Sequence, residues 1–183
     1  MNTHPVVGEA LTTTLDDEYR ARATYRAVLD KFGSVPPFAN IVEAEERHIN
    51  KLLPLFPRYG ITPPADRWSG QVTLPNSLVE CCQAGVDAEI SNYSMYDGYL
   101  AWLQEPDIRA AFINLRNASE FNHLPAFQRC VERASRTGSA PGFNPSGRSD
   151  GSALQIRGNT SQWILGGVLA GAALIYFMRR KAA

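Results

Sequence analysis

The sequence of 183 residues lacks a net charge, because 18 basic residues balance 18 acidic ones. This balance argues against the basic surface with which proteins bind nucleic acids, so no nucleic-acid partner is expected. The three cysteines form no C-x-x-C pair and no zinc-binding pattern, and an odd number of cysteines is not typical of a disulfide framework. The first eight residues contain no apolar stretch, so no cleavable secretion signal is expected.

Histidine is scarce as well, but two of the three histidines follow a glutamate at the same spacing. Glu45 precedes His48 by three residues, and Glu120 precedes His123 by three residues. Residues three apart lie on one face of an α-helix, so each pair can bind a metal ion from one side. Four-helix bundles that hold two metal ions use two such Glu-x-x-His pairs and one glutamate from each of the other two helices.

Four helices are predicted where apolar residues recur at alternating spacings of three and four. They cover approximately residues 9–32, 38–55, 77–103 and 107–135. The apolar residues of each helix form a stripe, or seam, along one face, which is interrupted only by residues of metal-ligand type. A pair of cations would compensate the charge of these buried residues. The sequence therefore predicts an all-α fold, an antiparallel four-helix bundle over residues 9–135, with a dinuclear site. The predicted ligands are Glu18, Glu45, His48, Glu89, Glu120 and His123.

Beyond the bundle the composition changes. Residues 136–162 are rich in Gly, Ser, Pro, Arg and Asn, which predicts a flexible linker. Residues 163–178 are uncharged, with aromatic residues near both ends, and a basic tail follows at 179–183. This pattern predicts a single-pass C-terminal transmembrane helix with membrane lipid as a partner and, without an export signal, a bundle on the cytoplasmic side. The motif Gly167-x-x-x-Gly171 would let two such helices pack closely, so a homodimer is one expected assembly.

Residues 17–25, 38–48 and 122–127 are similar to an uncharacterised rubrerythrin-like family of the ferritin-like superfamily of di-iron carboxylate proteins. The resemblance covers roughly residues 9–135 and implies two iron ions, or two manganese ions, bound by the six residues above. It departs from rubrerythrins at Asn92, where they tend to carry a second glutamate. A rubredoxin-type set of four cysteines is also missing, so the electron donor is an unidentified partner.

The predicted function is that of an oxidoreductase that oxidises Fe(II) or reduces peroxide or dioxygen at a carboxylate-bridged metal pair. Tyr25 and Tyr93 lie on the seams beside the ligands and are the candidate catalytic residues, with core tyrosines as the alternative interpretation. Pro125 removes a backbone donor and is expected to distort the helix that carries His123. Two other functions stay open: a di-iron hydroxylase or oxidase on a membrane-dissolved substrate, and a metal-free, membrane-anchored helical interaction module.

Two cysteines are predicted to meet near the site. Cys82 lies seven residues before Glu89, and Cys130 lies seven residues after His123. In an antiparallel helix pair these displacements point the same way, so the two thiols should lie at one level, ~10 Å from the metals. They are either a redox pair that supplies electrons to the site or two small buried apolar side chains.

Overall fold

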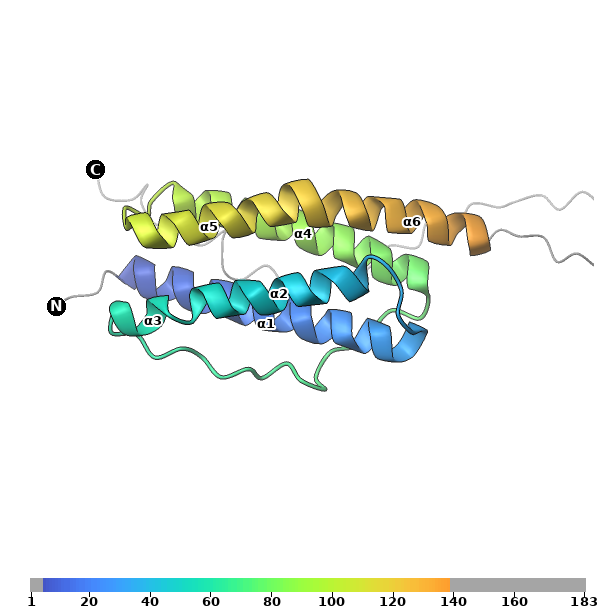
Figure 1. The fold of residues 1–183 in the computed structure, drawn as a ribbon, viewed down its shortest axis with the longest axis horizontal. Coiled ribbons are helices and arrows are strands. Elements are labelled where there is room, and N and C mark those ends of the chain that lie inside the picture. Colours follow the sequence, from blue (N-terminus) through green and yellow to red (C-terminus); the bar gives the residue numbers. More distant parts are fainter. Residues whose placement is uncertain (1–4, 139–183) are drawn as a thin grey trace, which may run out of the picture. The chain divides into compact units, whose positions relative to one another are not determined.

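The computed structural model describes residues 5–138, and the secondary structure in this range is entirely helical (Figure 1). The helices are α1 (Pro5–Phe32), α2 (Phe38–Leu52), α3 (Leu55–Arg58), α4 (Leu78–Leu100), α5 (Pro106–Ala118), the π-helical turn η1 (Ser119–His123) and α6 (Leu124–Gly138). Because α5, η1 and α6 follow one another without a break, they form one rod. Together with α1, α2 and α4 this rod makes a four-rod bundle, which confirms the all-helical prediction.

The rods pack as two antiparallel pairs, α1 with α2 and α4 with the α5–η1–α6 rod. A long connection after α3 carries the chain back along the bundle, so α4 begins at the same end as α2 (Figure 1). The helices α2 and α4 therefore run parallel to each other. Within each packed pair the two rods are antiparallel, as predicted.

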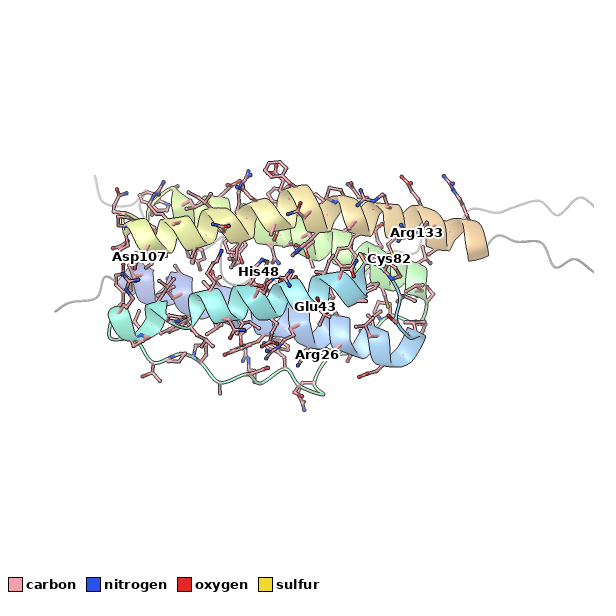
Figure 2. The ribbon with its side chains drawn as sticks, in the orientation of Figure 1. Arg26, Glu43, His48, Cys82, Asp107 and Arg133 are labelled. Atoms are coloured by element: carbon pink, nitrogen blue, oxygen red, sulfur yellow. A yellow bond between two sulfur atoms is a disulfide. The ribbon has the colours of Figure 1, made fainter. Side chains whose placement is uncertain are left out.

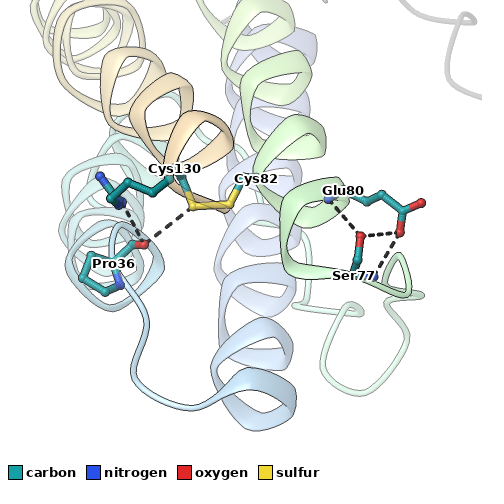
Figure 3. Close-up of a disulfide and its surroundings, with 6 residues drawn as sticks. Pro36, Ser77, Glu80, Cys82 and Cys130 are labelled. Atoms are coloured by element: carbon teal, nitrogen blue, oxygen red, sulfur yellow. Dashed lines mark hydrogen bonds between the residues drawn. A yellow bond between two sulfur atoms is a disulfide. The ribbon is translucent and has the colours of Figure 1, made fainter. Parts of the chain in front are cut away.

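Local signals in the sequence explain where the rods begin and end. Gly33, at φ 82°, ends α1 in a left-handed conformation that glycine adopts without strain. Ser77 caps α4: its hydroxyl oxygen accepts a bond from the backbone N–H of Glu80, and the Glu80 carboxylate accepts one from the backbone N–H of Ser77 (Figure 3). Pro106 opens α5, where its missing N–H is not needed.

The apolar core consists of two clusters, and a band of buried polar residues falls between them in every rod. The first cluster includes Leu11, Phe56 and Phe112, and the second includes Phe38 and Phe127. Along the chain, the buried polar residues lie between members of the two clusters in all four rods. These residues are Glu18 on α1, Glu45 on α2, Glu89 on α4 and His123 on η1, and the half-buried His48 on α2 lies beside them. The core is thus polar at one level.

The predicted distortion beside Pro125 is present. The turn Ser119–His123 is π-helical, with a wider hydrogen-bond spacing than the α-helices on either side. Pro125 has no N–H to donate to the carbonyl of Phe121, four residues earlier, so the regular α-helical ladder cannot continue through this turn. This wider turn carries both Glu120 and His123, which affects the directions in which these two side chains project.

The prediction of a transmembrane helix and of a membrane localisation needs correction. Within residues 5–138, no helix is both long and apolar enough to cross a membrane. The helix α1 has 28 residues, but charged side chains such as Asp17 and Arg22 lie along it, and a lipid-spanning helix tolerates few charges. Over residues 5–138 the fold class is therefore an all-helical bundle, and none of its helices is a membrane anchor. Residues 163–178, to which the prediction referred, lie outside the described residues.

Close packing between α4 and α6 depends on Gly85. A Cβ atom at this position would lie 2.5–2.8 Å from three atoms of the Phe127 ring, far inside van der Waals contact. The Phe127 ring is fully buried and packs against the rings of Tyr25 and Phe38, so it has no free space into which it can move. Gly85 therefore sets how closely the two rods approach beside the polar band.

We expect Gly85→Ala to lower the free energy of unfolding by ~1–3 kcal/mol, the usual cost of overpacking a core. The matched control is Gly98→Ala on the same helix, where a Cβ atom meets nothing within 4 Å. This control should stabilise the protein by up to ~1 kcal/mol through helix propensity. Urea unfolding measures both variants. Equal effects of the two substitutions would contradict the packing described for Gly85.

Candidate metal centre

Five of the six predicted ligands converge in the polar band. They form two groups, Glu18–Glu45–His48 and Glu45–Glu89–His123, and within each group the potential ligand atoms lie within 4.8 Å of one another. Glu45 belongs to both groups, so its two carboxylate oxygens face two adjacent positions. A carboxylate shared between two sets of potential ligands is compatible with a dinuclear metal site in a four-helix bundle.

The two imidazoles approach the carboxylates from the same side of the bundle. His48 Nδ1 lies 2.8 Å from Glu45 Oε2 and 3.3 Å from Glu18 Oε2. His123 Nδ1 lies 3.4 Å from Glu45 Oε1 and 3.5 Å from Glu89 Oε1. The two rings have centroids 5.6 Å apart, and Figure 2 shows His48 in the space between α2 and the neighbouring rod.

The donor set fits divalent cations, because its charges are buried and incompletely compensated. Glu18 and Glu45 are each 3% exposed and Glu89 is fully buried. Among residues 5–138, the ion pairs of these three carboxylates are with the two imidazoles only. Within the same residues, Glu89 Oε2 and His123 Nδ1 are buried without a hydrogen-bond partner. Buried carboxylates are costly without positive charge, so two ions placed here would satisfy both the charge and the unpaired atoms.

Two buried tyrosines hold Glu18 of α1 and Glu89 of α4, each from the opposite helix. The hydroxyl of Tyr25 on α1 donates to Glu89 Oε1 at 2.9 Å, and the hydroxyl of Tyr96 on α4 donates to Glu18 Oε1 at 2.5 Å. Each tyrosine follows the glutamate of its own helix by seven residues, so the arrangement is nearly symmetric. These bonds orient both carboxylates toward the centre of the bundle.

Of the two predicted catalytic tyrosines, the structure brings only Tyr25 to the cluster. Tyr93 is half-buried, and no hydrogen bond joins it to the five converging residues in the described part of the chain. Tyr96, which lies two helical turns beyond Glu89 rather than one, instead donates a hydrogen bond to Glu18 of the cluster. Both tyrosines lie on the predicted seam of this helix, so the periodicity alone cannot distinguish them.

The sixth predicted ligand, Glu120, does not join the cluster. Its carboxylate pairs with Arg116, which also donates to Asp97 Oδ1 at 2.9 Å on α4. The physical reason is the π-helical turn, in which residues three apart diverge more than on an α-helix. With His123 facing inward, Glu120 is directed toward Arg116. Its role as a ligand stays a prediction.

Burial and mutual repulsion place a proton on the cluster when no cation is bound. The pKa of Glu45 is raised well above its ordinary 4.5, first by burial and then by the neighbouring Glu18 charge. Burial also pushes the pKa of Glu18 upward, but the hydrogen bond and charge of His48 outweigh it, so this pKa is lowered. Glu45 is therefore the protonated member of the pair. Burial also raises the pKa of Asp17, beside Glu18, to about 6.

These observations define a class of protein: an all-helical bundle with a buried cluster of carboxylates and imidazoles. More particularly, the chain belongs to the family described as "Uncharacterized protein domain (DUF2202)", whose model matches residues 9–140. The rubrerythrin-like assignment within the ferritin-like proteins stays a prediction. Among proteins with curated functions, none matches this sequence significantly.

A solved structure supports the fold. The chain is similar to the crystal structure of the hypothetical protein MJ0754 from Methanococcus jannaschii, with a TM-score of 0.63 and 23% sequence identity. The similarity covers 70% of this chain and 81% of that one. At this level of identity the comparison supports the arrangement of helices and carries no information about the chemistry.

We expect the stability of the metal-free protein to fall as pH rises, and Glu45→Gln to reduce this dependence. The folded chain keeps a proton on Glu45 that the unfolded chain releases above about pH 4.5, so rising pH favours unfolding. The slope is at most ~1.4 kcal/mol per pH unit for one proton. Gln resembles the protonated carboxyl group, so above neutral pH the chelator-treated variant should be more stable than the wild type.

Urea unfolding in the presence of a chelator measures this difference. Asp17 also lowers the stability of the folded protein as pH rises to about 6, because its pKa is raised. Wild type and Glu45→Gln are therefore compared above that pH. Glu43→Gln, an exposed position on the same helix, is the matched control and should keep the wild-type slope. Parallel slopes for wild type and Glu45→Gln would show that Glu45 is not the protonated group.

Proposed function

We propose that this bundle is an oxidoreductase that binds two iron or manganese ions and reduces peroxide or dioxygen. The observation that carries the proposal is the convergence of three buried carboxylates and two imidazoles, from four rods, on one centre with Glu45 shared. Carboxylate oxygens combined with one imidazole per position suit iron or manganese better than copper. When bound, such a metal pair supplies two one-electron reductions at adjacent positions.

The residues of the chain have distinct roles in this proposal. Glu18 and His48 would hold one ion, Glu89 and His123 the other, and Glu45 would contact both. The hydroxyls of Tyr25 and Tyr96 keep the two outer carboxylates in place through their hydrogen bonds. Because these bonds also leave one oxygen of each carboxylate free of the tyrosine, they orient the glutamates without blocking them.

A cavity beside the two histidines favours a small uncharged oxidant over Fe(II) as the substrate. The cavity has a volume of about 380 Å³ and lies between α2 and the rod that contains η1 and α6. His48, His123 and the side chains of Arg47, Asn40 and Asn122 line it, together with apolar residues, and no carboxylate of the described chain does. A ferrous ion entering here would meet the Arg47 cation, whereas peroxide or dioxygen would meet no charge repulsion.

The metal-free interaction module is less well supported. It requires the acidic candidates to diverge or to pair with cations such as Arg22 and Arg116. Arg116 does pair with Glu120, but Arg22 pairs with Glu46 and Asp66 on the outside of the bundle. The three carboxylates at the centre are left to the imidazoles, which is difficult to explain for a surface module.

Metal analysis of the purified protein tests the site. We expect about two iron or manganese ions per chain in the wild type, and His48→Ala and His123→Ala should each lose one or both, because each variant removes one of only five converging ligands. Glu43→Gln is the matched control and should bind metal as the wild type does. Equal and negligible metal in all four proteins would remove the proposal.

Consumption of hydrogen peroxide by the anaerobically prepared ferrous protein tests the reaction. The iron-loaded wild type should consume peroxide, and Arg47→Glu should slow peroxide consumption little while accelerating uptake of Fe(II), because it reverses the charge at the cavity. Circular dichroism confirms that the variant is folded. Rapid Fe(II) oxidation by dioxygen with no peroxide consumption would favour an iron-oxidising function instead.

A further inference from the structure

Cys82 on α4 and Cys130 on α6 are joined by a disulfide, with their Cα atoms 5.7 Å apart (Figure 3). Cys82 is fully buried and Cys130 is 3% exposed. The predicted meeting of these two side chains is thus confirmed. The third cysteine, Cys81, is buried beside them and keeps a free thiol.

The disulfide lies near the metal centre along the bundle axis. Cys82 precedes Glu89 by seven residues and Cys130 follows His123 by seven, which corresponds to ~10 Å along each rod. Figure 2 shows the displacement from His48 toward Cys82 along the long axis of the bundle. The disulfide therefore lies about two helical turns from the carboxylate cluster.

Aromatic side chains fill the space between the disulfide and the cluster. Phe127 lies one helical turn before Cys130, and its ring centroid is 5.3 Å from that of Tyr25. The hydroxyl of Tyr25 in turn donates to Glu89 Oε1 at 2.9 Å. Cys82, Cys130, Phe127 and Tyr25 belong to one apolar cluster. The sulfur atoms and a predicted metal ligand are thus connected through packed side chains.

We propose that Cys82 and Cys130 are a redox pair that supplies the two electrons with which the metal centre reduces hydrogen peroxide. The inference rests on the proposed function and identifies its electron source. In the overall step, two S–H bonds break and one S–S bond forms, while the O–O bond of peroxide breaks. The two electrons leave the sulfurs, and the two thiol protons join the two peroxide protons in two molecules of water.

Two features support a redox role in addition to a purely structural one. The sulfur atoms are almost entirely shielded from solvent, so an oxidant in solution has little direct access to them, whereas the aromatic contacts connect them to the centre. The stoichiometry also agrees, because one dithiol yields two electrons and one peroxide consumes two. A disulfide that only linked α4 to α6 would form independently of the metal centre.

Counting thiols in the full-length chain tests the inference. The protein is fully reduced with dithiothreitol, freed of reductant, and loaded with Fe(II) without oxygen. Two equivalents of hydrogen peroxide are added, because the ferrous pair and the dithiol can each reduce one. The denatured chain is then alkylated and weighed by mass spectrometry. We expect the alkylated thiols to fall from three to one per chain, with Cys81 remaining. In Cys81→Ser they should fall from two to none, which locates the pair.

The controls separate this inference from the proposed function. The metal-free wild type and His48→Ala should keep three thiols over the same time. If the wild type binds metal and consumes peroxide but keeps three thiols, the redox pair is excluded and the proposed function stands. If the wild type binds no metal, the proposed function fails, and the redox pair fails with it. If the wild type binds metal but loses thiols equally with and without it, the metal-dependent oxidation of the pair is excluded. The wild-type measurement needs no cysteine variant at the pair, so a folding defect in such a variant does not affect the test.

Discussion

The structure depends on the cost of burying Glu18, Glu45 and Glu89 at one level of a helical bundle. Each of these carboxylates is at most 3% exposed, and within residues 5–138 their ion-pair partners are the imidazoles of His48 and His123. In an otherwise apolar core, such a cluster is stable only if protons or cations compensate its charge. The three buried carboxylates have no Lys or Arg partner among residues 5–138. This uncompensated charge is the clearest physical indication of a cation site.

The surrounding structure holds this cluster in place. Apolar clusters lie on both sides of the polar band, and each is formed by residues from several rods. Tyr25 and Tyr96 reach from one helix to the glutamate of the other, so α1 and α4 position each other's carboxylates. Gly85 lets α4 and α6 approach closely, with the Cys82–Cys130 disulfide one turn away. Packing, hydrogen bonds and a covalent link thus converge on the same region.

Much of this arrangement could be predicted from the sequence, because helical periodicity determines which residues share a face. It placed Glu18, Glu45 and Glu89 in the interior and brought Cys82 and Cys130 to one level. It could not place Glu120, whose direction follows from a π-helical turn that α-helical spacing does not describe. It also could not choose Tyr96 over Tyr93, since both lie on the same seam. The membrane-anchor prediction rested on an uncharged stretch with aromatic ends and a basic tail, and it was wrong for the fold class, because no helix within residues 5–138 can cross a membrane.

Anomalous X-ray scattering from crystals of the iron- or manganese-loaded protein tests the central claim most directly. Our interpretation predicts two strong peaks inside the bundle, one beside Glu18 and His48 and one beside Glu89 and His123, with Glu45 between them. Peaks confined to the protein surface, or a fully loaded crystal with no peak among these five side chains, would contradict it.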